Sequence, residues 1–142
     1  MPFAGYSMPI NYTKGIIKEH LHTRKYAGIF DVSHMGQILI PNTPNNCKEL
    51  EKIIPFDLFN LKLNKSAYSF ILNVNGGIID DIIISKININ NSEYFFLVYN
   101  ASRKNIDEKI FINKTNNYLI LKDHSFLAIQ GPLSSQVISN FS

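Results

Sequence analysis

Two adjacent carboxylates interrupt a run of isoleucines, and they are the first candidates for chemistry in the sequence. Asp80 and Asp81 follow Ile78 and Ile79 and precede three further isoleucines. Aspartate is depleted in β-strands, so a pair of them in such a run calls for an explanation. Successive strand residues face opposite sides of a sheet, which excludes a site shared in the manner of a protease dyad. We expect one aspartate to face a pocket, and the alternative is a bulge or cap aspartate beside an exposed one.

A hairpin turn in front of these aspartates determines which side chains lie beside them. Asn75–Gly76 stands between two apolar runs, and this dipeptide is a strong hairpin signal because both residues tolerate a positive φ. With a two-residue loop there, Phe70 lies directly opposite Asp81, and Tyr68 lies opposite Ile83. Any loop of even length puts Tyr68 and Asp81 on one face, whereas a three-residue loop puts them on opposite faces. Tyrosine on a strand is more often a packing residue, so the pairing only suggests a shared site.

A second polar cluster, Asp31, Ser33 and His34, invites comparison with a catalytic triad. Because neighbours on one strand alternate between faces, these side chains cannot line up as nucleophile, base and orienting group. We interpret His34 as a hydrogen-bonded structural residue. His20 and His22 lie two positions apart on an expected helix and point to different sides, which is poor geometry for a shared metal ion. The sequence therefore predicts no metal site.

The positions of these residues depend on the elements that carry them. Apolar spacing and turn residues predict helices over residues 15–26, 45–54 and 102–112 and from residue 131 to the end of the chain. They predict strands over residues 29–40, 68–74, 78–89, 94–99, 118–121 and 126–129. Asn45 or Asn46 is expected to cap the second helix, and Ser102 the third. Strands mixed with helices, together with a clear hairpin, indicate an α+β fold with a mixed or antiparallel sheet and flanking helices.

Length and composition limit the class of protein. The chain has 142 residues, of which 45% are hydrophobic and 18% charged, and its formal net charge is +3. This apolar content excludes a disordered tail, and no segment approaches the roughly 20 apolar residues of a membrane span. The basic residues form no stripe of the kind that binds nucleic acid. Cys47 is the one cysteine, so no internal disulfide is possible and a reducing compartment is expected.

Several motifs together resemble those of one protein family. The most specific are Phe30–Gly36, which reads Phe-Asp-Val-Ser-His-Met-Gly, and the Gly-Gly-x-x-Asp-Asp motif at Gly76–Asp81. Further matching segments follow in the family's order, at residues 3–9, 20–24, 68–69, 100–102 and 127–132. On these motifs, which extend over nearly the whole chain, the sequence resembles the N-terminal part of the T-protein of the glycine cleavage system, the tetrahydrofolate-dependent aminomethyltransferase.

The resemblance implies a folate-binding domain and a one-carbon transfer reaction. Members of this family accept an aminomethyl group carried on the lipoyl arm of H-protein, transfer its methylene carbon to tetrahydrofolate and release ammonia. The products are methylenetetrahydrofolate and H-protein with a reduced lipoyl arm. The resemblance thus implies lipoylated H-protein as the partner and tetrahydrofolate as the one-carbon acceptor. Neither a nucleic acid nor a membrane is expected as a partner.

The resemblance also implies roles for five residues. Asp81, the second aspartate of the Gly-Gly-x-x-Asp-Asp motif, corresponds to the catalytic aspartate near the folate, which assists the attack of the folate nitrogens on the aminomethyl carbon. A carboxylate suits this task because it can move a proton or stabilise a developing positive charge. Met35, Tyr68 and Asn100 match positions that line the folate pocket, and an asparagine amide can read a pterin edge with donor and acceptor together. Ile83 is expected to form a pocket wall because it shares the face of Asp81.

Members of the family are considerably longer than this chain. Residues 1–142 are therefore expected to form an incomplete folate-binding domain, a truncated form with little activity alone. The alternative function is a folate-binding relative on the same fold, either a demethylase or a non-catalytic assembly factor, and a third is an interaction module that binds no folate. The Asp80–Asp81 pair favours the transferase. The N-terminus lacks an Arg-rich presequence, which favours a bacterial cytoplasm, with the mitochondrial matrix as the location in a eukaryote.

Overall fold

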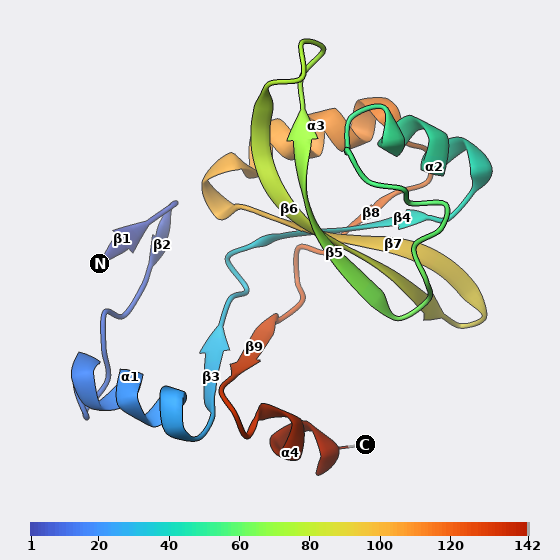
Figure 1. Cartoon of the computed structure of the whole chain (residues 1–142). Coiled ribbons are helices and arrows are strands. Elements are labelled where there is room, and N and C mark those ends of the chain that lie inside the picture. The colour runs from blue at the N-terminus through green and yellow to red at the C-terminus, as the bar shows by residue number, and fades with distance from the viewer. Residues whose placement is uncertain (142) are drawn as a thin grey trace. The chain divides into compact units, whose positions relative to one another are not determined.

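The structure is a computed structural model that describes residues 1–141, which form two compact units (Figure 1). Unit 1 combines Met1–His34 with the segment that begins at His124, and unit 2 is the continuous segment Met35–Asp123. The single incomplete domain that the sequence predicts for the whole chain stays a prediction.

One predicted strand is in fact two. The sequence predicts a strand over residues 29–40, but the chain forms β3 (Gly28–Asp31) in unit 1 and β4 (Gly36–Pro41) in unit 2. The cause is a turn after β3, in which the backbone N–H of Ser33 donates to Asp31 Oδ1 at 2.9 Å. Such a side-chain bond to the backbone two residues on competes with strand pairing.

Unit 2 is built on a five-stranded antiparallel sheet. In order across the sheet, the strands are β5 (Lys65–Leu72), β6 (Ile78–Ile89), β7 (Ser92–Tyr99), β4 and β8 (Leu119–Ile120). The helices α2 (Pro44–Glu51) and α3 (Lys104–Lys114) lie on the same side of the sheet (Figure 1), and the 3-10 helix η1 (Ala101–Arg103) leads into α3. The predicted α+β class, with an antiparallel sheet and flanking helices, is confirmed.

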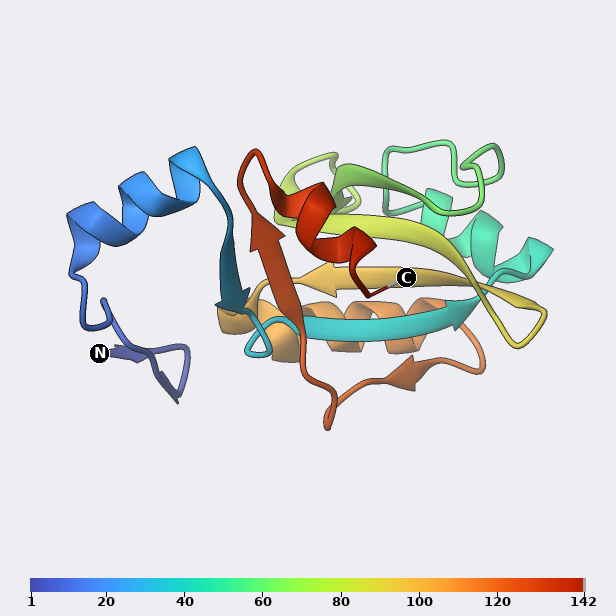
Figure 2. The ribbon, with the colours of Figure 1, turned by 90° about the horizontal axis from the view of Figure 1, so that it is seen from below.

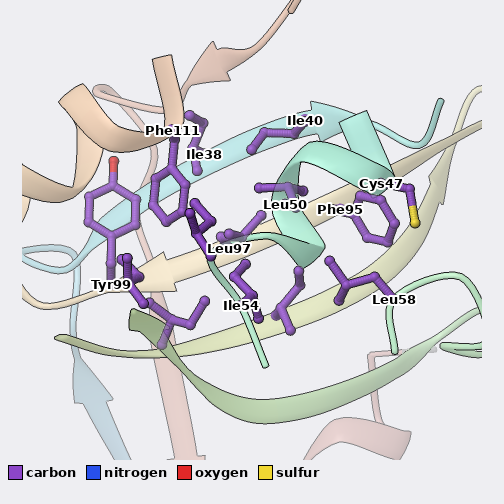
Figure 3. Packing of buried hydrophobic residues seen from close by; sticks show 14 of the residues in the cluster. Ile38, Ile40, Cys47, Leu50, Ile54, Leu58, Phe95, Leu97, Tyr99 and Phe111 are labelled. Atoms are coloured by element: carbon purple, nitrogen blue, oxygen red, sulfur yellow. The ribbon is translucent and has the colours of Figure 1, made fainter. Parts of the chain in front are cut away.

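The core of unit 2 lies between one face of the sheet and the two helices (Figure 3). Side chains alternate along each strand, so Ile38 and Ile40 of β4 both point inward and are fully buried. Leu50 of α2 and Phe111 of α3 pack against them from the helix layer. Other fully buried members of the cluster are Leu58, Ile71, Ile84, Phe95, Leu97 and Tyr99. Burial of each large apolar side chain stabilises the fold by about 1.5–3 kcal/mol, so this cluster dominates the stability of unit 2.

Gly36, at the start of β4, leaves room for an aromatic ring of the core. A Cβ atom at this position would overlap the ring of Tyr99 on the neighbouring strand. The Tyr99 hydroxyl in turn donates to Glu108 Oε1 at 3.0 Å, and burial together with Glu108 raises the pKa of Tyr99 well above its ordinary value. The glycine that ends the Phe30–Gly36 motif therefore has a packing role.

The loop between β5 and β6 is longer than either the two-residue or the three-residue loop considered from the sequence. It extends over residues 73–77, an odd number of residues. Asn73 closes it, because the backbone N–H groups of Asn75 and Gly77 both donate to Asn73 Oδ1 at 2.9 Å. By itself, a loop of odd length turns the following strand to the opposite face.

A one-residue bulge in β6 restores the predicted pairing. Leu72 pairs with Ile78 and Ile71 pairs with Asp80, so Ile79 has no partner on β5. The bulge therefore decides which side of the sheet each of the two aspartates faces. Beyond the bulge, the strands therefore have the register that a two-residue loop would give, with Phe70 opposite Asp81 and Tyr68 opposite Ile83.

A tight turn fixes the register of β7 against β6. Asn90–Asn91 link the two strands with φ angles of 50° and 63°, and asparagine tolerates this left-handed conformation better than most residues. The register then runs without a shift to the pair Ile82–Tyr99. Asn100, which follows Tyr99, therefore comes beside Asp81, which precedes Ile82.

Helix α2 begins earlier than predicted and has a different cap. It begins at Pro44, which suits the first helical position because the missing N–H needs no partner there. Thr43 Oγ1 accepts a hydrogen bond from the backbone N–H of Asn46 at 3.2 Å and is the cap. The predicted caps Asn45 and Asn46 are wrong. Asn46 is buried within the helix, where its Nδ2 donates to the carbonyl oxygen of Asn116 at 3.1 Å.

Unit 1 consists of short elements, and none of its described residues is buried. Strand β3 pairs with β9 (Leu127–Gln130) in antiparallel fashion (Figure 2), and β1 (Pro2–Phe3) pairs with β2 (Tyr6–Ser7). The helices are α1 (Ile16–Lys25) and α4 (Ser134–Ser139). The predicted helix over residues 15–26 is thus confirmed, although its apolar side chains are exposed. The predicted end of the last helix, residue 142, lies outside the described residues.

Candidate functional site

Three adjacent strands of unit 2 bring predicted site residues to one end of the sheet. Ile82 of β6 pairs with Tyr99 of β7, which pairs with Gly36 of β4, so the three form a row across the strands. The residues one position further along these strands are Asp81, Asn100 and Met35. They lie together beyond that row, at the end of the sheet from which β5 and β6 continue into their hairpin.

Tyr68 and Ile83 lie on the same face of the sheet as Asp81. Tyr68 pairs with Ile83, and Phe70 pairs with Asp81, and residues two apart on a strand share a face. The side chains of Tyr68 and Ile83 are 64% and 47% exposed, in contrast to the helix-covered core on the other face. The predicted common face of Tyr68 and Asp81 is confirmed.

Asn100 holds the Asp81 carboxylate. Its Nδ2 donates to Asp81 Oδ1 and to Asp80 Oδ1, both at 2.9 Å, with a longer contact of 3.4 Å to the carbonyl oxygen of Asp81. An amide oxygen in this place would meet only carboxylate and carbonyl oxygens, so the nitrogen must lie there. Both N–H bonds of Asn100 are thus used within the protein. A ligand at this position would meet only the acceptor of Asn100, whereas the sequence predicts that it meets donor and acceptor together.

The two aspartates face opposite sides but are not independent. Asp81 shares the face of Tyr68, whereas Asp80 has its Oδ2 buried on the side of α3. They do not form a protease-like dyad, but a single nitrogen of Asn100 bonds to both carboxylates.

The Tyr68 side chain combines an exposed ring with a hydroxyl near Asp81. Desolvation raises the pKa of Tyr68, and the neighbouring Asp81 carboxylate raises it further. The Tyr68 ring meets the Phe70 ring edge to face, with centroids 5.4 Å apart. A phenol that stays protonated beside a carboxylate can donate a hydrogen bond, and its exposed ring offers a surface on which a flat ligand can stack.

Two ionisable residues that lie behind this row are not among those predicted from the sequence. Asp107 of α3 is 0% exposed, and Arg103 of η1 donates from Nη2 to the carbonyl oxygen of Ile79 at 3.2 Å. Burial and, to a smaller extent, the neighbouring Asp80 raise the pKa of Asp107 to about 8, against a smaller, opposite effect of Arg103. The site therefore includes a carboxyl group that is largely neutral at pH 7.

The spacing of these residues contains the signal that was missed. Arg103 and Asp107 stand eight and four residues before the buried Phe111, and residues four apart share a helix face. The predicted cap of this helix, Ser102, is wrong, because η1 precedes α3 and no side chain caps either element.

The cluster of Asp31, Ser33 and His34 belongs to unit 1 and forms a turn. Ser33 Oγ accepts a hydrogen bond from the backbone N–H of Phe126 at 2.8 Å. The partner of this hydroxyl oxygen is thus a backbone group and not a histidine. The His34 ring meets the Phe3 ring edge-on, with centroids 5.8 Å apart. This arrangement is structural and contains no triad.

No metal centre is evident in the part of the chain that the structure describes. Within residues 1–141, no group of three or more His, Cys, Asp or Glu side chains is arranged to hold a metal ion. The predicted absence of a metal stays a prediction.

The motifs, the sheet and the row of site residues agree with a known family. A family model described as the GCVT N-terminal domain matches residues 1–142. The chain belongs to this family. The resemblance to the N-terminal part of the glycine cleavage T-protein is thereby confirmed.

Relatives within the family are named aminomethyltransferases. The mitochondrial aminomethyltransferase of Dictyostelium discoideum is 39% identical over 99% of this chain and 36% of its own length. The aminomethyltransferase of Clostridium botulinum (strain Okra / Type B1) is 37% identical over 96% of this chain and 37% of its own length. The crystal structure of the glycine cleavage system aminomethyltransferase T from Bartonella henselae matches with a TM-score of 0.83 and 37% identity, over 99% of this chain and 38% of that chain. The chain thus spans little more than a third of the length of these relatives.

Proposed function

We propose that this chain forms the Asp81 side of the folate site in a tetrahydrofolate-dependent aminomethyltransferase of the glycine cleavage system. The reaction moves the methylene carbon of an aminomethyl group from the lipoyl arm of H-protein to tetrahydrofolate, and it releases ammonia and leaves a reduced lipoyl arm. The family of the chain and the names of its relatives support this proposal. Because the chain spans about a third of those relatives, the reaction is proposed for a protein of their full length that contains it.

The observation that carries the proposal is the Asp81 carboxylate at the end of the sheet. Asn100 bonds to Oδ1 of this carboxylate at 2.9 Å and fixes its direction. The exposed Tyr68 ring lies on the same face, one strand away. A fixed carboxylate beside an exposed aromatic ring suits a ligand that has both a flat ring system and reactive N–H groups.

Asp81 is the proposed catalytic residue, and its role follows from the charge that the reaction develops. A folate nitrogen that attacks the aminomethyl carbon gains a bond and a positive charge, and it must then lose a proton. A carboxylate at this point stabilises the charge or accepts the proton. Of the two carboxylate oxygens of Asp81, Asn100 donates only to Oδ1, so it orients the carboxylate without engaging both oxygens.

The remaining residues of the proposed pocket fit a folate by residue type. The Tyr68 ring is available for stacking on the pterin or aminobenzoyl ring. The flexible Met35 and the half-exposed Ile83 provide apolar contact. The amide oxygen of Asn100 can accept a hydrogen bond from a pterin N–H group.

The partner and the compartment belong to the same proposal. Lipoylated H-protein is the proposed donor of the aminomethyl group, as the resemblance implies. The bacterial cytoplasm is the proposed location, or the mitochondrial matrix in a eukaryote. None of the helices in residues 1–141 is long and apolar enough to cross a membrane.

Binding can be tested on the chain itself by nuclear magnetic resonance. Titration of the ¹⁵N-labelled chain with tetrahydrofolate should shift the resonances of Tyr68, Asp81 and Asn100. Tyr68→Ala should weaken binding roughly tenfold, the equivalent of about 1.4 kcal/mol of ring contact. Tyr12→Ala removes a tyrosine in unit 1 that is similarly exposed, at 70% against 64%, and should have no effect. Shifts that are absent, or that gather elsewhere, would contradict the proposed site.

Turnover requires the remainder of the enzyme, which a chimera supplies. In it, this chain replaces the aligned segment of the Clostridium botulinum aminomethyltransferase, and formation of methylenetetrahydrofolate is measured with aminomethyl-lipoyl H-protein. Asp81→Asn should lower kcat by roughly 10²–10⁴, the usual range for loss of a general acid–base group. Asp80→Asn is the matched control and should cost much less. Equal losses would show that the proposed face is wrong, and folate binding without turnover would favour a non-catalytic folate-binding relative.

A further inference from the structure

A cluster of polar atoms is buried between strand β6 and helix α3, on the side of the sheet opposite to Tyr68 and Asp81. Both carboxylate oxygens of Asp107, Oδ2 of Asp80 and Nε of Arg103 are buried without a hydrogen-bond partner among the described residues. Buried polar atoms in folded proteins are nearly always paired, so four unpaired atoms in one cluster call for an explanation.

The two carboxyl groups need a proton between them. Asp107 faces Asp80, and its pKa is raised first by burial and then by this neighbour. Two ionised carboxylates that share a buried site repel each other, whereas a single shared proton converts the repulsion into a hydrogen bond. The same proton gives a partner to one buried oxygen on each side.

We propose that Asp107 is a positioning residue for Asp81 and acts through a chain of three hydrogen bonds. Protonated Asp107 donates to Asp80 Oδ2 and so holds the Asp80 carboxylate in place. Asp80 Oδ1 then accepts one N–H of Asn100, whose second N–H holds Asp81 Oδ1. Loss of the Asp107 proton would place two negative charges side by side, and the Asp80 anchor of Asn100 would be lost with it.

Several other groups surround Asp107 and affect its charge. Asp81 of β6 adds to the effect of Asp80, and Arg103 of η1 opposes both. The Tyr99 hydroxyl of β7 is also near Asp107, and it donates a hydrogen bond to Glu108, the next residue of α3. Arg103 is already engaged with the Ile79 carbonyl, so its charge reduces the repulsion between the carboxylates without removing it.

The shared proton and the orientation of Asn100 follow from this chain's own contacts. Only the consequence for folate rests on the proposed function. If the Asn100 oxygen and the Asp81 carboxylate bind tetrahydrofolate, then loss of the Asp107 proton should weaken that binding, although Asp107 itself does not touch the ligand.

The experiment follows the loss of the Asp107 proton and the response of Asn100 in the 142-residue chain, by nuclear magnetic resonance between pH 5 and pH 10. With ¹³C-labelled aspartate carboxyl groups, Asp107 should titrate near pH 8. The side-chain NH₂ resonances of Asn100 should shift with the same midpoint. Asp107→Asn keeps a donor toward Asp80 and should abolish the pH-dependent shift of the Asn100 resonances. Asp123→Asn changes an exposed residue and should leave that shift unchanged.

Tetrahydrofolate affinity supplies the second measurement. Between pH 7 and pH 9 it should fall about tenfold in the wild-type chain, the effect of losing one hydrogen-bond anchor, and should stay constant in Asp107→Asn. An Asp107 that titrates in the ordinary aspartate range, or Asn100 resonances that do not follow it, would overturn the inference even if the variant fails to fold. If both titrations occur but tetrahydrofolate does not bind at any pH, the proposed function fails and the positioning network stands.

Discussion

The two units of this chain are built from similar residues but differ in what they bury. Every buried residue that the structure describes belongs to unit 2. Unit 1 contains apolar side chains such as Ile17, Leu21 and Phe30, yet all three are exposed. A broad sheet with helices on one face gives the isoleucines of unit 2 a common interior, whereas the short strand pair and the helix α1 do not. An apolar pattern therefore predicts that an element forms, but not that it finds a core.

The candidate site lies entirely in the unit that has the core. Asp81 and Asn100 sit one residue beyond the row of Ile82 and Tyr99, which are almost completely buried. Asp81 lies on a packed strand and Asn100 directly follows one, so packed strands support both positions. Groups that must be held within a fraction of an ångström of a reacting atom benefit from such support.

The largest expected difference between the units is in amide hydrogen exchange. Amides of β6 and β7 should be protected by a factor on the order of 10³ or more, because only global unfolding opens a packed sheet. Amides of α1 should exchange almost as in an unfolded chain, because a helix of ten residues without buried contacts is marginal in water. Exchange followed by mass spectrometry or nuclear magnetic resonance measures both. Equal protection of α1 and β6 would remove the contrast between the units.

A matched pair of leucine substitutions makes the same comparison in free energy. Leu50 of α2 is fully buried in unit 2, whereas Leu21 of α1 is 59% exposed in unit 1. Leu50→Ala should lower the free energy of unfolding by about 2–5 kcal/mol through lost burial and a cavity. Leu21→Ala should change it by less than about 0.5 kcal/mol. Urea unfolding of the two variants tests this, and a comparable cost at Leu21 would show that unit 1 has a core of its own.

Predictions from the sequence were most accurate where local chemistry sets the structure. The bounds predicted for β6, residues 78–89, agree with the structure, because turn-forming Asn and Gly residues stand at both of its ends. The helix over residues 15–26 was found for the same kind of reason. The prediction of one continuous strand over residues 29–40 was wrong, because the Asp31–Ser33 turn interrupts the apolar pattern.

Predictions were wrong or missing where the contacts and burial of a residue are set by elements distant in the sequence. Asn46 is a reasonable cap by residue type, but its partner Asn116 lies on a segment 70 residues away. Asp107 looks like a solvated helix charge until α3 is packed against β6. The common face of Tyr68, Asp81 and Ile83 follows from strand alternation alone, whereas the bond from Asn100 to both aspartates requires the register of a third strand.

The units also differ in their response to pH, because the pKa of Asp107 in unit 2 is raised whereas the pKa of Asp31 in unit 1 is lowered. In unit 2, the raised pKa of Asp107 means that the folded chain holds a proton that the unfolded chain releases above its ordinary value of 3.8. Stability should therefore fall between about pH 4 and the folded value of about 8, by at most about 1.4 kcal/mol per pH unit. In unit 1, hydrogen bonds from Ser33 lower the pKa of the exposed Asp31. Its contribution is present above the ordinary aspartate pKa and is lost only as the pH falls below it.

These signs define a test between pH 5 and pH 8, where Asp107, unlike Asp31, should differ in charge between the folded and the unfolded chain. The free energy of unfolding of the wild-type chain should decline across this range, and Asp107→Asn should remove the decline. Asp31→Asn should run parallel to the wild type, because Asp31 stays ionised in both the folded and the unfolded chain at these pH values. Urea unfolding at each pH measures all three proteins. A decline that persists in Asp107→Asn would mean that the buried carboxyl of unit 2 is ionised in the folded state, and the proton between Asp80 and Asp107 would have to be abandoned.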